Sequence, residues 1–222
     1  RSWFAQRSEP TVEAPRGEVV LFDDTFTQFQ NVQVGRAATR VLEALGYRVV
    51  LVDRNECCGR PAISNGMPDM AREQAQKNVQ QLLPYAERGV PIVGTEPSCL
   101  LTLRDEYPDL LRDEPLHTAS VTVAGKALLM DELIAQLSDD DPSIGDIFRE
   151  DVTAKILLHG HCHQKAIAGM DPTLTALALA PGYQVDLVDS PCCGMAGSFG
   201  FETEHYEISR AMGALKLFPS VQ

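Results

Sequence analysis

The sequence predicts an α/β fold built from two duplicated lobes, each a parallel sheet flanked by helices. Three observations support this prediction. Short apolar segments alternate with longer segments of helical periodicity, which is typical of parallel sheets covered by helices. The motif Cys-Cys-Gly occurs twice, at 57–59 and 192–194. The residues around the second copy repeat those around the first at an offset near 136, so we expect a pseudo-twofold axis between the lobes.

The first lobe is predicted to open with an apolar strand at 18–22. A helix follows, because apolar residues recur at i, i+3, i+4, i+7, i+8 and i+11 between Val34 and Leu45. Gly46 is expected just beyond that helix, where the left-handed backbone favours glycine. A second strand is predicted at 47–53.

The rest of the chain continues the alternation. A second amphipathic helix is predicted from Met67 to Leu83, with Met67 and Met70 on its buried face. A third strand is expected at 90–93 and a further helix at 124–137. The unit then restarts at Ile156. The predicted domains are an N-terminal tail (1–17), lobe one (18–137), an acidic linker (138–153) and lobe two (154–222).

Composition narrows the class of function. The chain has 222 residues and a net charge of −12, and an acidic surface disfavours nucleic acid and anionic lipid as partners. The apolar runs are too short to span a membrane. No signal peptide is visible, so we expect a cytoplasmic protein, and a start at Arg1 rather than Met suggests a piece of something longer.

The cysteines are the candidate site residues, and each falls at a predicted strand end, where α/β sheets form their sites. Adjacent cysteines do not easily form a disulfide with each other, but both can bind one inorganic cluster. Six cysteines in such a chain therefore indicate metal or redox chemistry. The candidate ligands are Cys57, Cys58, Cys99, Cys162, Cys192 and Cys193.

Four segments around these cysteines resemble the cysteine-rich CCG family, and the resemblance covers about 18–218. The segments are Cys57–Pro61, Glu96–Cys99, His161–Lys165 and Cys193–Gly200. The family includes a subunit of heterodisulfide reductase and the iron–sulfur subunits of glycolate oxidase and anaerobic glycerol-3-phosphate dehydrogenase. The closest similarity is to a branch in which the CCG region follows an FAD-linked oxidase domain and ferredoxin-like clusters.

The resemblance implies an iron–sulfur electron-transfer region of an oxidoreductase. Electrons would come from a flavin domain that oxidises a 2-hydroxy acid such as lactate, glycolate or 2-hydroxyglutarate. The implied cofactors are an iron–sulfur cluster of the 4Fe-4S type, held by the six cysteines in the intact protein, and FAD on a separate domain. The implied partners are flavin oxidase and ferredoxin-like domains of the same or another chain. Peripheral contact with a membrane through these partners is an alternative that stays open. No catalytic residue of this chain is predicted, because no Ser-His-Asp or paired-carboxylate motif is present.

Each lobe is one cysteine short of the family pattern. The offset of 136 places Phe26 opposite Cys162, since 162 − 136 = 26, and only 222 − 193 = 29 residues follow Cys193. We therefore expect the second lobe to be truncated at its C-terminus and the chain as it stands to carry no intact four-iron cluster. We also expect the cysteines of both lobes to face one cleft between them.

Several alternatives remain open. One alternative is that the lobes are a degenerate docking module without a cluster, and another is that they are a disulfide reductase module. Zinc is an alternative metal, with His161 or His163 as a ligand or as a hydrogen-bond donor to sulfur. Arg60 and Lys165 either offset the charge of a thiolate-ligated cluster or are ordinary surface cations.

Overall fold

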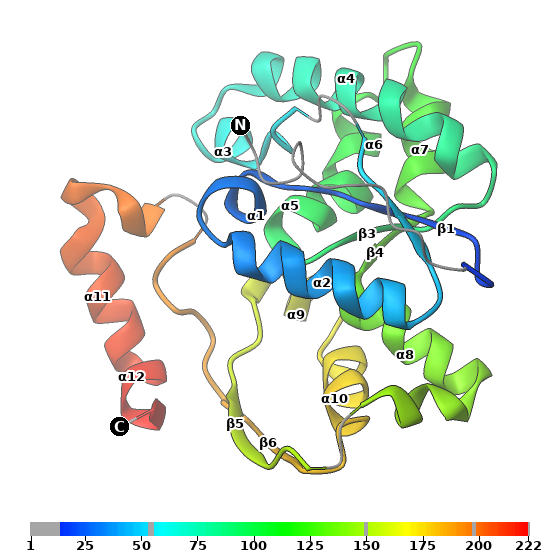
Figure 1. The fold of residues 1–222 in the computed structure, drawn as a ribbon. Helices are drawn as coiled ribbons and strands as arrows, with labels where there is room; N and C mark the ends of the chain where they lie inside the picture. Colours follow the sequence, from blue (N-terminus) through cyan, green and yellow to red (C-terminus); the bar gives the residue numbers. More distant parts are fainter. Residues whose placement is uncertain (1–13, 53–55, 149–150, 197–198, 222) are drawn as a thin grey trace. The chain divides into compact units, whose positions relative to one another are not determined.

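The computed structural model describes residues 14–52, 56–148, 151–196 and 199–221 (Figure 1). The chain divides into two compact units, Arg1–Leu133 and Ile134–Gln222. The pseudo-twofold axis and the shared cleft concern the placement of one unit against the other, and both stay predictions. Within the described ranges, no helix combines the length and the apolar character needed to cross a bilayer.

The first unit is an α/β fold around a four-stranded parallel sheet of order β2-β1-β3-β4, as the alternation predicts. The strands are β1 (Glu18–Leu21), β2 (Arg48–Val50), β3 (Ile92–Gly94) and β4 (Ala127–Leu129). The central strand β1 pairs with β2 from Glu18↔Arg48 and with β3 from Val20↔Ile92. Its apolar residues 19–21 are fully buried, which explains why β1 is apolar without alternation.

Helices cover both faces of this sheet (Figure 1). On one face lies α2 (Val32–Ala44), and on the other lie α4 (Pro68–Glu87) and α7 (His117–Ala124), which pack on each other. Shorter elements connect them: α1 (Thr25–Phe29), α3 (Arg60–Ser64), α5 (Pro97–Leu101), the π-helical turn η2 (Thr102–Glu106) and α6 (Tyr107–Leu110). Gly46 follows α2 with φ +89°, so its predicted left-handed conformation is confirmed.

The predicted helix at 124–137 is wrong in its first part. The helix α7 ends at Ala124 with Gly125 as its cap, and residues 127–129 then form β4 beside β3. The helix α8 (Met130–Asp140) begins only after that strand. An apolar run of three or four residues fits either period, and pairing with the edge of β3 decides for the strand.

The predicted burial of Met67 and Met70 is also wrong, because their side chains are 52% and 53% exposed. Met67 precedes α4 as its N-cap residue. The buried stripe of α4 runs along positions four and three residues apart and consists of Ala71, Ala75, Asn78, Val79, Leu82 and Ala86. Met70 lies beside this stripe rather than on it.

The second unit contains a two-stranded parallel sheet. Its strands, β5 (Ala154–Leu158) and β6 (Tyr183–Leu187), pair from Ala154↔Tyr183 to Leu158↔Leu187. The helices α9 (Cys162–Ile167) and α10 (Asp171–Ala178) connect the strands. The other elements of this unit are η3 (Pro142–Ile147), η4 (Phe199–Phe201), η5 (Thr203–His205), α11 (Tyr206–Leu215) and α12 (Leu217–Val221).

Candidate metal centre

The strand order of the first unit creates a switch point between β1 and β3. The chain leaves β1 toward β2 on one side and then crosses to β3 on the other side of β1. Open α/β sheets bind ligands beyond the carboxyl ends of strands at such a point. Three segments follow those ends: Thr25 opens α1 after β1, Cys57 and Cys58 precede α3 after β2, and Cys99 lies in α5 after β3.

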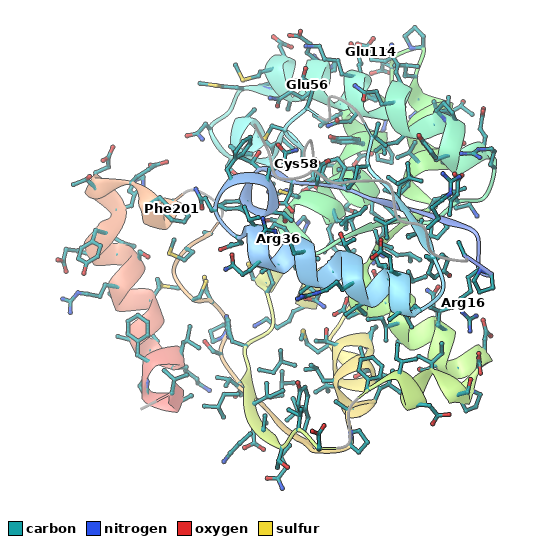
Figure 2. The ribbon with its side chains drawn as sticks, viewed as in Figure 1. Arg16, Arg36, Glu56, Cys58, Glu114 and Phe201 are labelled. Atoms are coloured by element: carbon teal, nitrogen blue, oxygen red, sulfur yellow. The ribbon has the colours of Figure 1, made fainter. Side chains whose placement is uncertain are left out.

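The three thiols of the first unit form one chain of contacts. Cys57 lies close enough to Cys58, and Cys58 to Cys99, for each to influence the pKa of its neighbour in the group. Cys58, which is labelled in Figure 2, and Cys99 are buried, with exposed fractions of 2% and 7%, and Cys57 is half-buried. The structure therefore brings together three predicted ligands from two distant parts of the chain.

The environment of Cys57 and Cys58 raises the pKa of both thiols, which favours their protonated form when no cation is present. The pKa of Cys57 is raised by its hydrogen bond to Cys58, by burial and by the charge of Cys58. For Cys58, the hydrogen bond from Cys57 lowers the pKa, but the hydrogen bond to Cys99, burial and the charge of Cys99 outweigh it, so the pKa is raised. Because thiolate is the metal-binding form, a bound cation has to supply the charge that the site lacks.

The Cys-Cys-Gly motif forms the same local structure in both units. Gly59 and Gly194 have φ values of +89° and +93°, which favour glycine. This turn directs the amide of Gly194 to the Cys192 sulfur at 3.3 Å. In the first unit the amides of Gly59 and Arg60 act toward lowering the pKa values of Cys57 and Cys58, respectively. The glycine thus lets the backbone donate to a sulfur that carries charge when it binds metal.

A buried pair of side chains, Asn78 and Tyr107, holds the first motif in place. Asn78 accepts from the Glu56 amide at 3.0 Å and donates to the carbonyl of Cys57 at 3.2 Å. The Tyr107 hydroxyl donates to the carbonyl of Cys58 at 3.0 Å. Burial, and next the charge of Cys58, raise the Tyr107 pKa well above its usual value, so the phenol stays a donor.

Neither residue of this pair was among the predicted site residues. Asn78 carried a signal, because it is a polar residue on the buried stripe of α4 and such groups need partners. The residues next to Tyr107 in the sequence give no signal of its role.

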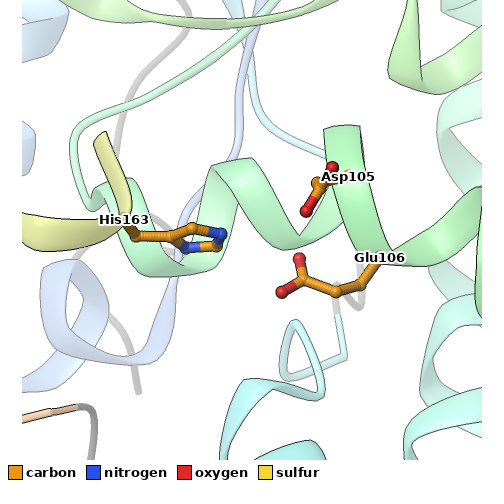
Figure 3. Close-up of side chains that lie close together, drawn as sticks. All are labelled: Asp105, Glu106 and His163. Atoms are coloured by element: carbon orange, nitrogen blue, oxygen red, sulfur yellow. The ribbon is translucent and has the colours of Figure 1, made fainter. Parts of the chain in front are cut away.

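Arg60 is ion-paired with Glu106, and both side chains are partly buried. Figure 3 shows Glu106 beside Asp105 at the end of η2. A carboxylate therefore offsets the positive charge of Arg60 in this structure. The hypothesis that Arg60 serves mainly to offset a cluster's charge gains no support from this pairing.

In the second unit, Cys162 is exposed at the first position of α9, and Cys192 and Cys193 are half-buried after β6. His161 caps α9, because its Nδ1 accepts from the amide of His163, also drawn in Figure 3, at 3.2 Å. The ammonium of Lys165 donates to the carbonyl of Ser190 at 2.5 Å, directly before the motif. Lys165 thus orders the loop that carries the cysteines.

The two units share one plan up to the motif, and their strand pairing gives the register. Arg48 pairs with Glu18, and Gln184 pairs with Lys155, so the offset is 184 − 48 = 136 for the second strand and 155 − 18 = 137 for the first. The helix caps agree, since Asp24 caps α1 and His161 caps α9, with 161 − 24 = 137.

This register makes Thr25, rather than Phe26, the counterpart of Cys162, since 162 − 137 = 25. The sequence match missed it by one residue because β1 is buried throughout and lacks the alternation that would set its register.

The spacing of the thiols does not match a closed tetrahedral zinc site. Around one tetrahedral zinc, with Zn–S near 2.3 Å, sulfur atoms lie about 3.8 Å apart. Among the described residues, no three cysteine sulfurs lie within 4.8 Å of one another. A cluster places its thiolates on different iron atoms and so accepts wider spacing. The first unit supplies three thiols, which do not complete a set of four ligands.

Comparisons with known proteins show which proteins the chain as a whole is similar to. The model of the CCG family, described as a cysteine-rich domain, matches residues 20–104. The chain is 32% identical over 216 residues to a subunit of the anaerobic glycerol-3-phosphate dehydrogenase of Escherichia coli (strain K12), which covers 96% of this chain and 52% of the relative. It is 27% identical to D-2-hydroxyglutarate dehydrogenase of the same strain, over 92% of this chain and 19% of the relative.

A third relative is matched over most of its own length. Lactate utilization protein A of Anoxybacillus flavithermus (strain DSM 21510 / WK1) is 30% identical over 185 residues, which cover 82% of this chain and 74% of the relative. The chain spans about half of the glycerol-3-phosphate dehydrogenase relative and about a fifth of the hydroxyglutarate dehydrogenase. Together with the two Cys-Cys-Gly turns, this similarity shows that the chain belongs to the cysteine-rich CCG domain family.

Proposed function

We propose that this chain is an iron–sulfur electron-transfer region of an oxidoreductase. The observation that carries the proposal is the buried chain of thiols from Cys57 through Cys58 to Cys99 at the switch point of the sheet. Cys162, Cys192 and Cys193 are the ligands proposed in the second unit. When bound, the cluster supplies one-electron transfer.

The residues around the thiols support that role by stabilising negative charge on sulfur. The amide of Gly194 donates to the Cys192 sulfur, and the amides of Gly59 and Arg60 act toward lowering the pKa values of Cys57 and Cys58. Donors of this kind, with burial, set the reduction potential of sulfur-ligated iron. Asn78 and Tyr107 bind the carbonyls of the first motif and so keep the sulfurs oriented. Burial of Cys58 and Cys99 keeps water from the site.

The electron donor that we propose is a flavin on a separate domain, which oxidises a 2-hydroxy acid. Two relatives favour this class by name, D-2-hydroxyglutarate dehydrogenase and lactate utilization protein A. The partners are then the flavin oxidase and ferredoxin-like domains of the same or another chain. All six cysteines are free thiols, which suits the reducing cytoplasm where we place the protein.

Iron and acid-labile sulfide analysis of anaerobically loaded protein tests the proposal. Cys58→Ala removes the central thiol, and Val123→Ala is its control, because both side chains are buried in the first unit and Val123 lies in α7. We expect Cys58→Ala to lose the iron and sulfide of the first unit and Val123→Ala to keep them. Equal metal content in the two variants contradicts iron binding at the thiols and favours a docking module.

A further inference from the structure

The position equivalent to Cys162 in the first unit carries a hydroxyl. Three residues separate the end of β1 from Thr25, which opens α1, and three separate the end of β5 from Cys162, which opens α9. Each helix is capped by the preceding side chain, Asp24 in one unit and His161 in the other. The backbone therefore delivers Thr25 to the place where the second unit presents a thiol.

Thr25 lies within reach of the other ligands. Its hydroxyl lies close enough to the sulfur of Cys57 to act toward lowering the pKa of that thiol, as the amide of Gly59 also does. The residue is exposed, whereas Cys58 and Cys99 are buried. The side of the thiol group that Thr25 occupies is thus the side that faces solvent.

We infer that the first unit, although one cysteine short of the family pattern, binds its cluster through three thiolates, Cys57, Cys58 and Cys99, and that the fourth ligand position, beside Thr25, is open to a small external ligand such as a thiolate. This inference replaces the expectation, based on the number of cysteines alone, that the chain as it stands carries no intact four-iron cluster. This inference rests on the proposed function and adds an accessible coordination position to it. The Thr25 hydroxyl is a positioning group for Cys57, and its oxygen replaces the sulfur that would close the site.

The test uses the 222-residue chain with the cysteines of the second unit replaced (Cys162→Ser, Cys192→Ser and Cys193→Ser), so that any iron signal comes from the first unit. The chain is loaded anaerobically with iron and sulfide and then reduced. Its electron paramagnetic resonance spectrum is recorded with and without 2-mercaptoethanol, the probe for the open position. Thr25→Cys, Thr25→Ser and Phe26→Cys are compared, the last as a control one residue along α1.

We expect 2-mercaptoethanol to shift the spectrum of the background protein, of Thr25→Ser and of Phe26→Cys. Thr25→Cys should show no shift, and its spectrum without the thiol should match the thiol-saturated background. Bound iron without a thiol response in the background protein overturns the inference and leaves the proposed function standing. A response abolished in Phe26→Cys rather than in Thr25→Cys also overturns it. Absence of iron from the background protein overturns the proposed function in this unit, and the inference with it.

The titration of the background protein needs no substitution at position 25, so a folding defect in one variant does not affect it. Urea unfolding midpoints of the variants check that each is folded. The exposed position of Thr25 makes the cysteine substitution a mild one.

Discussion

The side-chain amide of Asn78 donates a hydrogen bond of 2.8 Å to the hydroxyl of Tyr107, and both residues are fully buried. Asn78 lies in α4 and Tyr107 opens α6, and each also binds a carbonyl of the first Cys-Cys-Gly motif. The pair therefore joins two helices to the loop that carries Cys57 and Cys58. Satisfied polar groups of this kind specify one arrangement of a core, because any alternative leaves them unpaired.

Tyr107→Phe should lower the free energy of unfolding by about 1–3 kcal/mol, because it leaves the Cys58 carbonyl and an Asn78 N–H buried without their partner. Urea unfolding measures the loss. Tyr85→Phe in α4 is the control, since Tyr85 is only half-buried. Equal losses in the two variants would show that the Tyr107 hydroxyl has no special role.

Gly194→Ala should be more damaging than Gly59→Ala. Both positions have a left-handed backbone, which disfavours alanine by about 1–2 kcal/mol. A Cβ at Gly194 also meets the carbonyl oxygen of Ser209 at 2.1 Å, whereas the nearest atom at Gly59 is 3.4 Å away. Thermal unfolding of the two variants gives the comparison, with Gly145→Ala as the control because a Cβ there meets nothing within 4 Å. The reverse order of stability contradicts the prediction.

Lys165→Met should destabilise the second unit by about 1.5–3 kcal/mol, because the ammonium donates to the buried Ser190 through a charge-assisted bond. The matched control is Lys155→Met, since Lys155 forms an exposed ion pair with Asp186 that contributes about 0–1 kcal/mol. Urea unfolding monitored by circular dichroism separates the two. A loss no larger than that of Lys155→Met would mean that the ammonium does not order the motif loop.

Met70→Gln should change the stability by less than about 0.5 kcal/mol, because the side chain is half exposed. Val79→Ala in the same helix should cost about 2 kcal/mol, since Val79 is fully buried. Chemical denaturation of both variants checks the buried face of α4. A large loss of stability in Met70→Gln would support the buried face that periodicity alone predicts, with Met70 on it.

The sequence predicts the fold class and the place of the cysteines at strand ends, because strand–helix alternation and the repeated motif are local signals. It does not predict β4, whose three residues read as part of a helix until the edge of β3 pairs with them. Periodicity overstates the buried face of α4 at Met70. The contacts of Asn78 and Tyr107 join segments far apart in the chain, and no local pattern records them. The sequence offset gives Phe26 instead of its neighbour Thr25 as the counterpart of Cys162, because a strand buried on both faces has no alternation to set its register.

The thiols of the first unit come from places 99 − 58 = 41 residues apart, and α4 lies between them. An unfolded chain has to close that long loop before a third sulfur can join the adjacent pair, and closing it is entropically unfavourable. Until β3 docks beside β1, the chain presents two neighbouring thiols and a distant third. On the proposed function, metal loading follows folding in time, and during biosynthesis the iron donor has to recognise a folded acceptor rather than a nascent peptide.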